Sequence, residues 1–147
     1  MEITLRPALE SDIEFLMDLR RTTLHRYIDE IGMPNSQEAY RERVLYKFDC
    51  AQIVEVNGSP AGLFKVEYHA DQHQWYVIQI QIAADYQNLK IGSQLIHSLQ
   101  EKARLDGASV GLGVIKTNPA QRLYARLGFK QVGESKFEYE LEFHPES

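Results

Sequence analysis

The residues from Tyr86 to Ile96, YQNLKIGSQLI, have the types and spacing that a phosphate site can use. They follow a strand-like run, WYVIQIQIAAD, and lead into a helix-like one. Because such a turn presents backbone amides, and a helix N-terminus carries roughly half a positive charge, the two together can hold an anion. The alternative is a plain turn in which Gly92 only permits close packing. The turn alone does not decide between them.

Two common phosphate-binding motifs do not occur in this stretch. A dinucleotide-binding fingerprint needs GxGxxG, and a P-loop needs GxxxxGK followed by Ser or Thr. The residues around Gly92 form neither pattern. The sequence therefore disfavours dinucleotide and nucleoside triphosphate chemistry, and only the general amide cradle remains.

The elements around this turn follow from hydrophobic periodicity and from the residues that start and stop helices. A capping box of Ser11 and Glu14 is expected to start the first helix, and Asn57-Gly58 predicts a tight hairpin. The predicted elements are a strand at 2–6, helices at 11–31 and 36–48, hairpin strands within 52–69, a strand at 75–84, a helix from 91 that ends at Gly107, a strand at 109–115, a helix from Asn118 to Gly128, and two final strands ending in the alternating run 136–144.

This order, β-α-α-β-β-β-α-β-α-β-β, predicts an α+β fold with a mixed sheet. Three consecutive antiparallel strands occupy its middle, and two late crossover helices are expected to bring a parallel pair. About four helices accompany the sheet. The length of 147 residues suits one domain over 1–147.

Composition excludes several classes of protein. Hydrophobic residues at 44% and charged residues at 25% are ordinary for a globular protein, and a net charge of −5 argues against coating nucleic acid or an anionic membrane. No run reaches the ~18 apolar residues of a membrane span, and the first residues, MEITLRP, do not read as a signal peptide. We therefore expect a cytoplasmic protein with no nucleic-acid or membrane partner.

A second segment, NPAQRLYARLGF at 118–129, lies about one βα unit beyond the turn. Together the two segments resemble the GNAT superfamily of N-acetyltransferases, in which a strand with a β-bulge leads to a Q/R-x-x-G-x-G/A turn that binds the pyrophosphate of acetyl-CoA. Asn118, Tyr124, Gly128 and Phe129 correspond to the named residues of the family's NxxAxxxYxxxGF pattern, with one residue fewer between Asn118 and Tyr124. The run LRPALESDIEFLMDL also looks like the family's first strand and helix. The resemblance implies a GNAT-like fold, acetyl-CoA as cosubstrate and no metal.

The resemblance also implies which residues bind the cofactor. Backbone groups of the strand before the turn would receive the pantetheine arm and polarise the thioester carbonyl, and amides of the turn would receive the pyrophosphate. The implied residues are Ile80, Gln81, Ile82, Gln87, Asn88, Leu89, Lys90, Ile91, Gly92, Ser93, Asn118 and Tyr124.

Two departures from the family pattern concern this site. Lys90 stands where the family usually has its first glycine, so the turn must accommodate a side chain there. Ala120 lies one position earlier than the alanine of the usual pattern. Neither departure prevents a cradle of backbone amides, and the charge of Lys90 could add to the attraction for a phosphate.

Tyr124 matches the family's usual general acid. A tyrosine with a pKa of ~10 gives its proton to a thiolate of about 8.5 to 9 at a cost of roughly 1.4 to 2 kcal/mol. The alternative is a core residue, since Tyr124 has Ala120, Leu123 and Leu127 beside it at helical spacing.

The general base is less defined, because the strand that precedes the turn carries no carboxylate. Glu67 on the neighbouring strand is the candidate side chain, and a water chain to bulk solvent is the alternative. His69, Asp71 and His73 fall in a predicted loop, and we interpret them as solvated residues.

The leading hypothesis is an acetyl-CoA-dependent N-acetyltransferase that moves the acetyl group directly to a primary amine of a small molecule or peptide. The alternatives are a GNAT-like module that binds acyl-CoA without turnover, as a sensor or scaffold, and a structural interaction domain that uses the acidic strand 136–144. The negative charge mildly favours cationic amines. Family members are often dimers, so a homodimer is one possible state of this chain. The sequence does not identify the acceptor amine.

Overall fold

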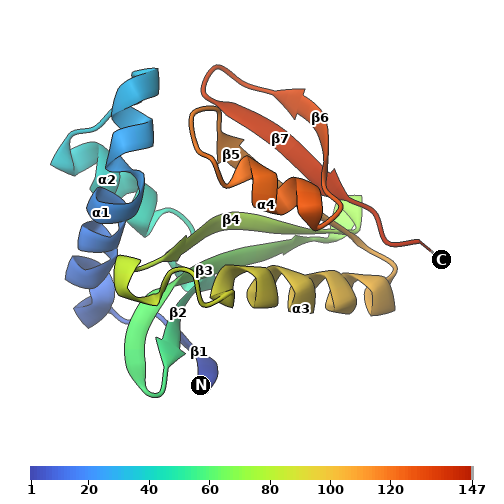
Figure 1. Cartoon of the computed structure of the whole chain (residues 1–147), viewed down its shortest axis with the longest axis horizontal. Helices are drawn as coiled ribbons and strands as arrows, with labels where there is room; N and C mark the ends of the chain where they lie inside the picture. The colour runs from blue at the N-terminus through green and yellow to red at the C-terminus, as the bar shows by residue number, and fades with distance from the viewer. Residues whose placement is uncertain (147) are drawn as a thin grey trace. The chain divides into compact units, whose positions relative to one another are not determined.

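The computed structural model describes residues 1–146 (Figure 1). Its strands and helices are β1 (Ile3–Pro7), α1 (Ile13–Ile31), α2 (Gln37–Leu45), β2 (Ala51–Val56), β3 (Ser59–His69), β4 (Gln74–Ile82), α3 (Ile91–Asp106), β5 (Ser109–Ile115), α4 (Gln121–Arg126), β6 (Lys130–Glu134) and β7 (Glu138–Phe143). The order of elements is the predicted one.

The strands form a seven-stranded sheet in the order β1-β2-β3-β4-β5-β7-β6. β4 and β5 pair in parallel, with Gln74 opposite Ser109 and Val77 opposite Leu112. Helix α3 connects these two strands, as a parallel pair requires. The prediction of a mixed α+β fold with a parallel pair and about four helices is confirmed.

The chain divides into two compact units. The first contains residues 1–65 and 79–91, and the second contains residues 66–78 and the chain from residue 92 onward. Strands β3 and β4 each pass from one unit to the other.

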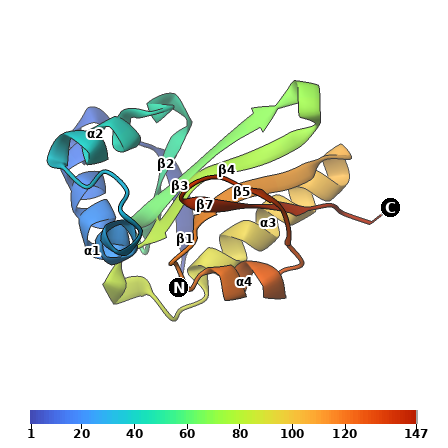
Figure 2. The ribbon, with the colours of Figure 1, turned by 90° about the horizontal axis from the view of Figure 1, so that it is seen from above.

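In the first unit, α1 and α2 lie side by side, as Figures 1 and 2 show from two directions. The core of this unit includes Leu16, Ile28 and Tyr40 of the helices and Ile53 and Leu63 of the strands, all buried. The hairpin between β2 and β3 turns at Asn57 and Gly58, whose φ angles of 50° and 85° are both positive. This geometry is the one that Asn-Gly predicts.

In the second unit, α3 buries the stripe that its periodicity predicts, namely Leu95, Ile96, Leu99 and Ala103. An aromatic cluster joins α4 to β7. The ring of Phe129 lies 5.9 Å from the ring of Tyr124 and 5.9 Å from that of Phe143. Phe143 therefore lies on the packed face of β7, as the alternation of 136–144 predicts.

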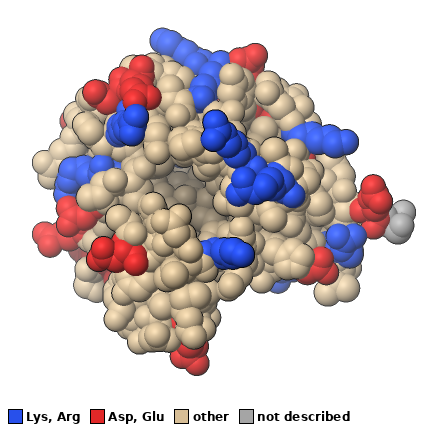
Figure 3. Space-filling model, in the orientation of Figure 1, with Lys and Arg blue, Asp and Glu red and all other residues tan. Residues whose placement is uncertain are grey.

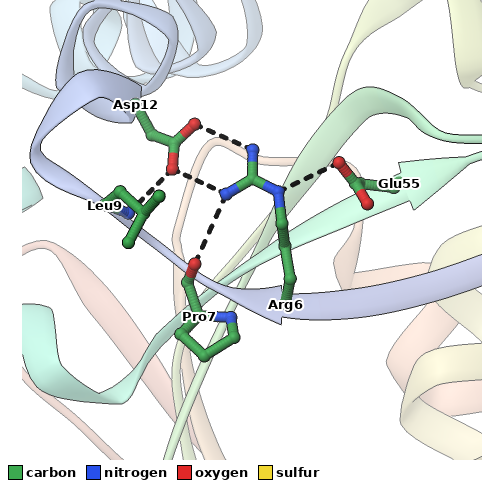
Figure 4. Close-up of polar contacts among 5 residues, drawn as sticks. All are labelled: Arg6, Pro7, Leu9, Asp12 and Glu55. Atoms are coloured by element: carbon green, nitrogen blue, oxygen red, sulfur yellow. Dashed lines mark hydrogen bonds and ion pairs between the residues drawn. The ribbon is translucent and has the colours of Figure 1, made fainter.

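The start of the first helix differs from the prediction. Ser11 and Glu14 form no capping box, because a short 3-10 turn at Glu10–Asp12 precedes α1. Asp12 instead accepts the Leu9 amide at 2.7 Å and both terminal nitrogens of Arg6 at 2.8 and 2.9 Å (Figure 4). A carboxylate held by Arg6 is a stronger local partner than a serine hydroxyl, since hydrogen bonds between charged groups are roughly twice as strong as neutral ones. The arginine hydrogen bonds hold the pKa of Asp12 below its usual range.

Candidate functional site

Strand β4 leads into the candidate cofactor turn with an unusual burial pattern. Gln79 and Gln81 are buried, whereas Ile80 and Ile82 are only half-buried. The alternation of the two faces is as predicted, but the polar side chains occupy the enclosed face. Strand β3 comes very close here, because a Cβ added at Gly62 would lie 2.3 Å from the backbone oxygen of Gln81. The half-buried isoleucine side therefore offers an apolar surface at the end of β4.

The turn itself follows a 3-10 segment, Ala84–Tyr86, and exposes residues 87–90. Gln87 closes it: its backbone amide donates to the oxygen of Ala84 at 3.2 Å, and its side-chain Nε2 donates to the oxygen of Ile82 at 2.9 Å. Asn88 and Lys90 have φ angles of 67° and 63°, in the left-handed region, with Leu89 between them outside it. Alternation of this kind forms concave nests of amides that bind anions.

The conformation of Lys90 explains why the family usually has glycine at this position. Its φ of 63° is one that glycine adopts without steric cost and that an L-residue adopts at a cost of roughly 1 to 2 kcal/mol. The position therefore favours glycine for backbone reasons. Lys90 keeps the backbone geometry of the turn and adds an exposed positive charge.

No packing contact within residues 1–146 explains why residue 92 is a glycine. Its φ lies outside the left-handed region, and, apart from its chain neighbours and the backbone of its own helix, no atom of residues 1–146 lies within 4 Å of where a Cβ would stand. Neither strain nor close packing therefore requires glycine in the first turn of α3. The first amides of a helix have no intrahelical partner and carry its positive end. The space beside Gly92 leaves room for a ligand at the start of α3, and the phosphate cradle remains a prediction.

Asn118 and Tyr124 lie around α4. The side chain of Asn118 accepts the amide of Ala120 at 2.9 Å, as an N-cap residue does, although the α-helix proper starts at Gln121. Tyr124 is 7% exposed, and burial raises its pKa to about 12. Its hydroxyl makes no hydrogen bond within the part of the chain that the structure describes.

This pKa changes the energetics expected of a general acid. Proton transfer from a group near 12 to a thiolate of about 8.5 to 9 costs roughly 4 to 5 kcal/mol, more than the ordinary tyrosine assumed from the sequence. The difference arises because the sequence does not show how completely the hydroxyl is removed from water.

Glu67, the candidate base, is half-buried on β3 and paired with a histidine. Its Oε1 lies 3.0 Å from Nε2 of His69, whose ring stacks on that of Tyr76 at 5.7 Å. A carboxylate with a neighbouring imidazole can relay a proton. Its catalytic role remains a prediction.

Lys65 is a buried group whose importance the sequence did not indicate. Its side chain is fully buried, and Nζ donates to the backbone oxygens of Arg43, Val44 and Tyr46 at 3.2, 3.1 and 2.5 Å. The ammonium thereby satisfies carbonyls at the C-terminal end of α2. Burial, and then the charges of Arg43 and Arg20, lower its pKa to about 8. The only signal was a lone lysine within the apolar run LFKV.

Charged side chains of both signs are interspersed on the face drawn in Figure 3. Within residues 1–146, no group of three or more His, Cys, Asp or Glu side chains could hold a metal ion. None of the helices in this part of the chain combines the length and the hydropathy needed to span a membrane.

Comparison with known proteins gives a family and a fold. The model of the acetyltransferase (GNAT) family matches residues 13–129. No curated protein sequence matches the chain significantly.

Three solved structures illustrate the similarity. The paiA N-acetyltransferase from Thermoplasma acidophilum, in complex with coenzyme A, has a TM-score of 0.74 at 16% identity over 99% of this chain and 100% of that one. N-acetylglutamate synthase from Neisseria gonorrhoeae, complexed with coenzyme A and N-acetyl-glutamate, has a TM-score of 0.71 at 17% identity over 100% of this chain and 36% of that one. The ribosomal-protein-S18-alanine N-acetyltransferase from Escherichia coli has a TM-score of 0.66 at 15% identity over 97% of this chain and 94% of that one. At these identities the likeness concerns the fold.

Proposed function

The chain belongs to the acetyltransferase (GNAT) family, and from that membership we propose that it moves the acetyl group of acetyl-CoA directly to a primary amine of a small molecule or peptide. Acetyl transfer as such follows from the family. The observation that supports a working cofactor site is the turn before α3, where Asn88 and Lys90 are left-handed and Gly92 leaves open space.

The proposed cofactor contacts follow from which groups are free. Gln87 uses its amide and its side-chain nitrogen inside the turn, so its role is to shape the cradle. The amides of Asn88, Leu89, Lys90, Ile91, Gly92 and Ser93 would bind the pyrophosphate. Backbone groups of Ile80, Gln81 and Ile82 would bind the pantetheine arm, and Asn118 would hold the start of α4 in place.

The reaction requires three events. The amine nitrogen attacks the thioester carbonyl carbon, a C–N bond forms as the C–S bond breaks, and the departing thiolate takes a proton. We assign that proton to the hydroxyl of Tyr124. The acceptor must also lose a proton, which costs roughly 4 to 5 kcal/mol for an amine with a pKa of ~10.4 at neutral pH. Glu67 or a chain of water molecules would receive it.

The test is to incubate the protein with acetyl-CoA and a panel of primary amines and to follow release of free thiol. We expect release that depends on both the protein and an amine. Calorimetry with acetyl-CoA alone is the matched measurement, because failure to bind the cofactor would contradict the proposed site irrespective of the acceptor chosen.

A second candidate is a module that binds acyl-CoA without turnover. One observation favours it: β4 carries no carboxylate from Gln74 to Ile82. Tight cofactor binding with no thiol release for any amine of the panel would favour this candidate over catalysis.

A further inference from the structure

Gln79 carries a buried hydrogen-bond acceptor that the protein itself does not use. The residue belongs to the first unit, near the end of β4, and is only 8% exposed. Its Oε1 is buried and has no hydrogen-bond partner within residues 1–146. Burying an acceptor without a donor disfavours folding, so such an atom in a native structure requires an explanation.

Two other buried glutamines show the arrangement that is usual for a buried amide. Nε2 of Gln74 donates to Oγ of Ser109 at 3.2 Å, and Nε2 of Gln100 donates to the backbone oxygen of Leu127 at 2.8 Å. Neither of these side chains has a buried polar atom without a partner among the described residues. Internal hydrogen bonding therefore accounts for Gln74 and Gln100, but it does not account for Oε1 of Gln79.

The position of Gln79 along β4 connects this acceptor with the candidate cofactor site. The pairing of β4 with β5 runs from Gln74 to Val77, and Gln79 lies two residues beyond its end. The next residues, 80–82, are those proposed to receive the pantetheine arm of acetyl-CoA. Gln79 thus lies at the start of the segment along which the arm would bind.

The chemistry of the cofactor indicates which part of it suits this atom. A carbonyl oxygen needs a donor. The pyrophosphate presents acceptor oxygens at neutral pH, whereas the pantetheine arm carries amide N–H groups. The side-chain amide of a glutamine can turn at low cost, because the energy profile of its last torsion is broad. Oε1 of Gln79 therefore fits the arm and not the phosphates.

We propose that Oε1 of Gln79 accepts a hydrogen bond from an amide N–H of the pantetheine arm and so fixes the position of the arm along β4. The inference rests on the proposed cofactor site and extends it, because that site uses only backbone groups of β4. Gln79 binds the cofactor in this scheme and takes no part in proton transfer.

The experiment compares Gln79→Met with Gln74→Met, which makes the same change at a glutamine that donates within the protein. Calorimetry with acetyl-CoA alone gives the Kd, and urea denaturation gives the stability. We expect Gln79→Met to weaken binding about fivefold or more, because the N–H of the arm loses its acceptor. Its urea midpoint should stay the same or rise, because no internal hydrogen bond is lost. Gln74→Met should show the reverse, with a lower midpoint and a Kd within about twofold of wild type.

A second ligand locates the contact on the cofactor. The nucleotide half, 3′-phospho-ADP, lacks the pantetheine arm, so its Kd should be the same for the wild type and for Gln79→Met. In NMR spectra, the side-chain amide signals of Gln79, identified by their loss in Gln79→Met, should shift with acetyl-CoA and stay in place with 3′-phospho-ADP.

The outcomes separate this inference from the proposed function. If the wild type binds acetyl-CoA and Gln79→Met binds it equally well, the role of Gln79 is overturned and the cofactor site stands. If the wild type does not bind acetyl-CoA, both are overturned. Equal weakening of acetyl-CoA and 3′-phospho-ADP would move the effect away from the arm and contradict the inference. A midpoint for Gln79→Met as low as that of Gln74→Met would also contradict it, since the amide would then have an internal partner.

Discussion

Tyr124 combines a reactive group with a packing role, and the two can be separated by removing one oxygen. Tyr124→Phe keeps the ring against Phe129 and removes a hydroxyl that makes no hydrogen bond in the described chain, so we expect unfolding free energy to change by less than about 1 kcal/mol. Loss of a general acid lowers kcat by about 10²- to 10⁴-fold. Steady-state thiol release and a denaturation curve measure the two effects.

The matched control for this variant is Tyr68→Phe, which makes the same change at an exposed ring that lies tilted against that of Trp75. It is expected to leave kcat unchanged. A Tyr124→Phe enzyme with wild-type kcat would assign Tyr124 to the core and remove it from the mechanism.

Lys65 predicts an unusual pH dependence of stability. Below pH 8 this lysine is charged in both the folded and the unfolded chain, and burial of that charge disfavours the fold. Between its folded pKa of about 8 and the ordinary value of 10.5, the unfolded chain binds more protons than the folded one. Unfolding free energy should therefore rise with pH in this window, by at most about 1.4 kcal/mol per pH unit.

Other groups titrate in the same window, so the measurement is a difference between two proteins. Urea denaturation of the wild type and of Lys65→Met from pH 7 to 10.5 isolates the lysine. We expect the variant to be less stable by about 1 to 3 kcal/mol at pH 9, because three carbonyls lose their donor, and its pH slope to be flatter. Parallel curves would contradict the depressed pKa.

At the scale of elements, the turn that leads into α3 tests whether Lys90 acts through its backbone or its charge. Lys90→Gly relieves the left-handed strain, while Lys90→Ala keeps the strain and removes the same charge. We expect Lys90→Gly to be more stable than Lys90→Ala by about 1 kcal/mol in thermal or urea unfolding.

Cofactor affinity then distinguishes the two roles. If the cradle consists of backbone amides, the Kd for acetyl-CoA stays within about threefold of wild type in both variants. An equal loss of affinity in both, by tenfold or more, would show that the ammonium of Lys90 contacts a phosphate.

The elements were predictable where one or two neighbouring residues decide the backbone. Gly32, Gly107 and Gly128 have positive φ angles at the ends of their helices, and Asn57-Gly58 makes the expected hairpin. The start of α1 was predicted wrongly because Arg6, six residues before Asp12, takes part in it. A capping rule that considers four consecutive residues does not include such a partner.

The sequence marks the candidate site only in part, and its residue roles remain predictions. The glycine and its flanking amides can be read as a candidate from the sequence, and the family pattern marks Tyr124. The burial of Gln79 and Gln81, the raised pKa of Tyr124 and the carbonyl cluster at Lys65 depend on neighbours distant in sequence. Periodicity assigns residues to faces of a strand, but the fold decides which face is enclosed.

At the scale of the whole molecule, a ligand that binds only the folded chain must raise its stability by mass action. At a concentration 100 times its Kd, acetyl-CoA should add about 2.7 kcal/mol to the unfolding free energy, read as a shift of the urea midpoint. ATP serves as a control because the sequence contains no triphosphate motif, and S-acetyl-pantetheine serves as a second because it lacks the pyrophosphate. If the amides after Gln87 supply most of the affinity, S-acetyl-pantetheine at the same concentration gives less than half of the shift. An equal shift with ATP would mean nonspecific anion binding, and an equal shift with S-acetyl-pantetheine would move the main binding energy from the turn to β4.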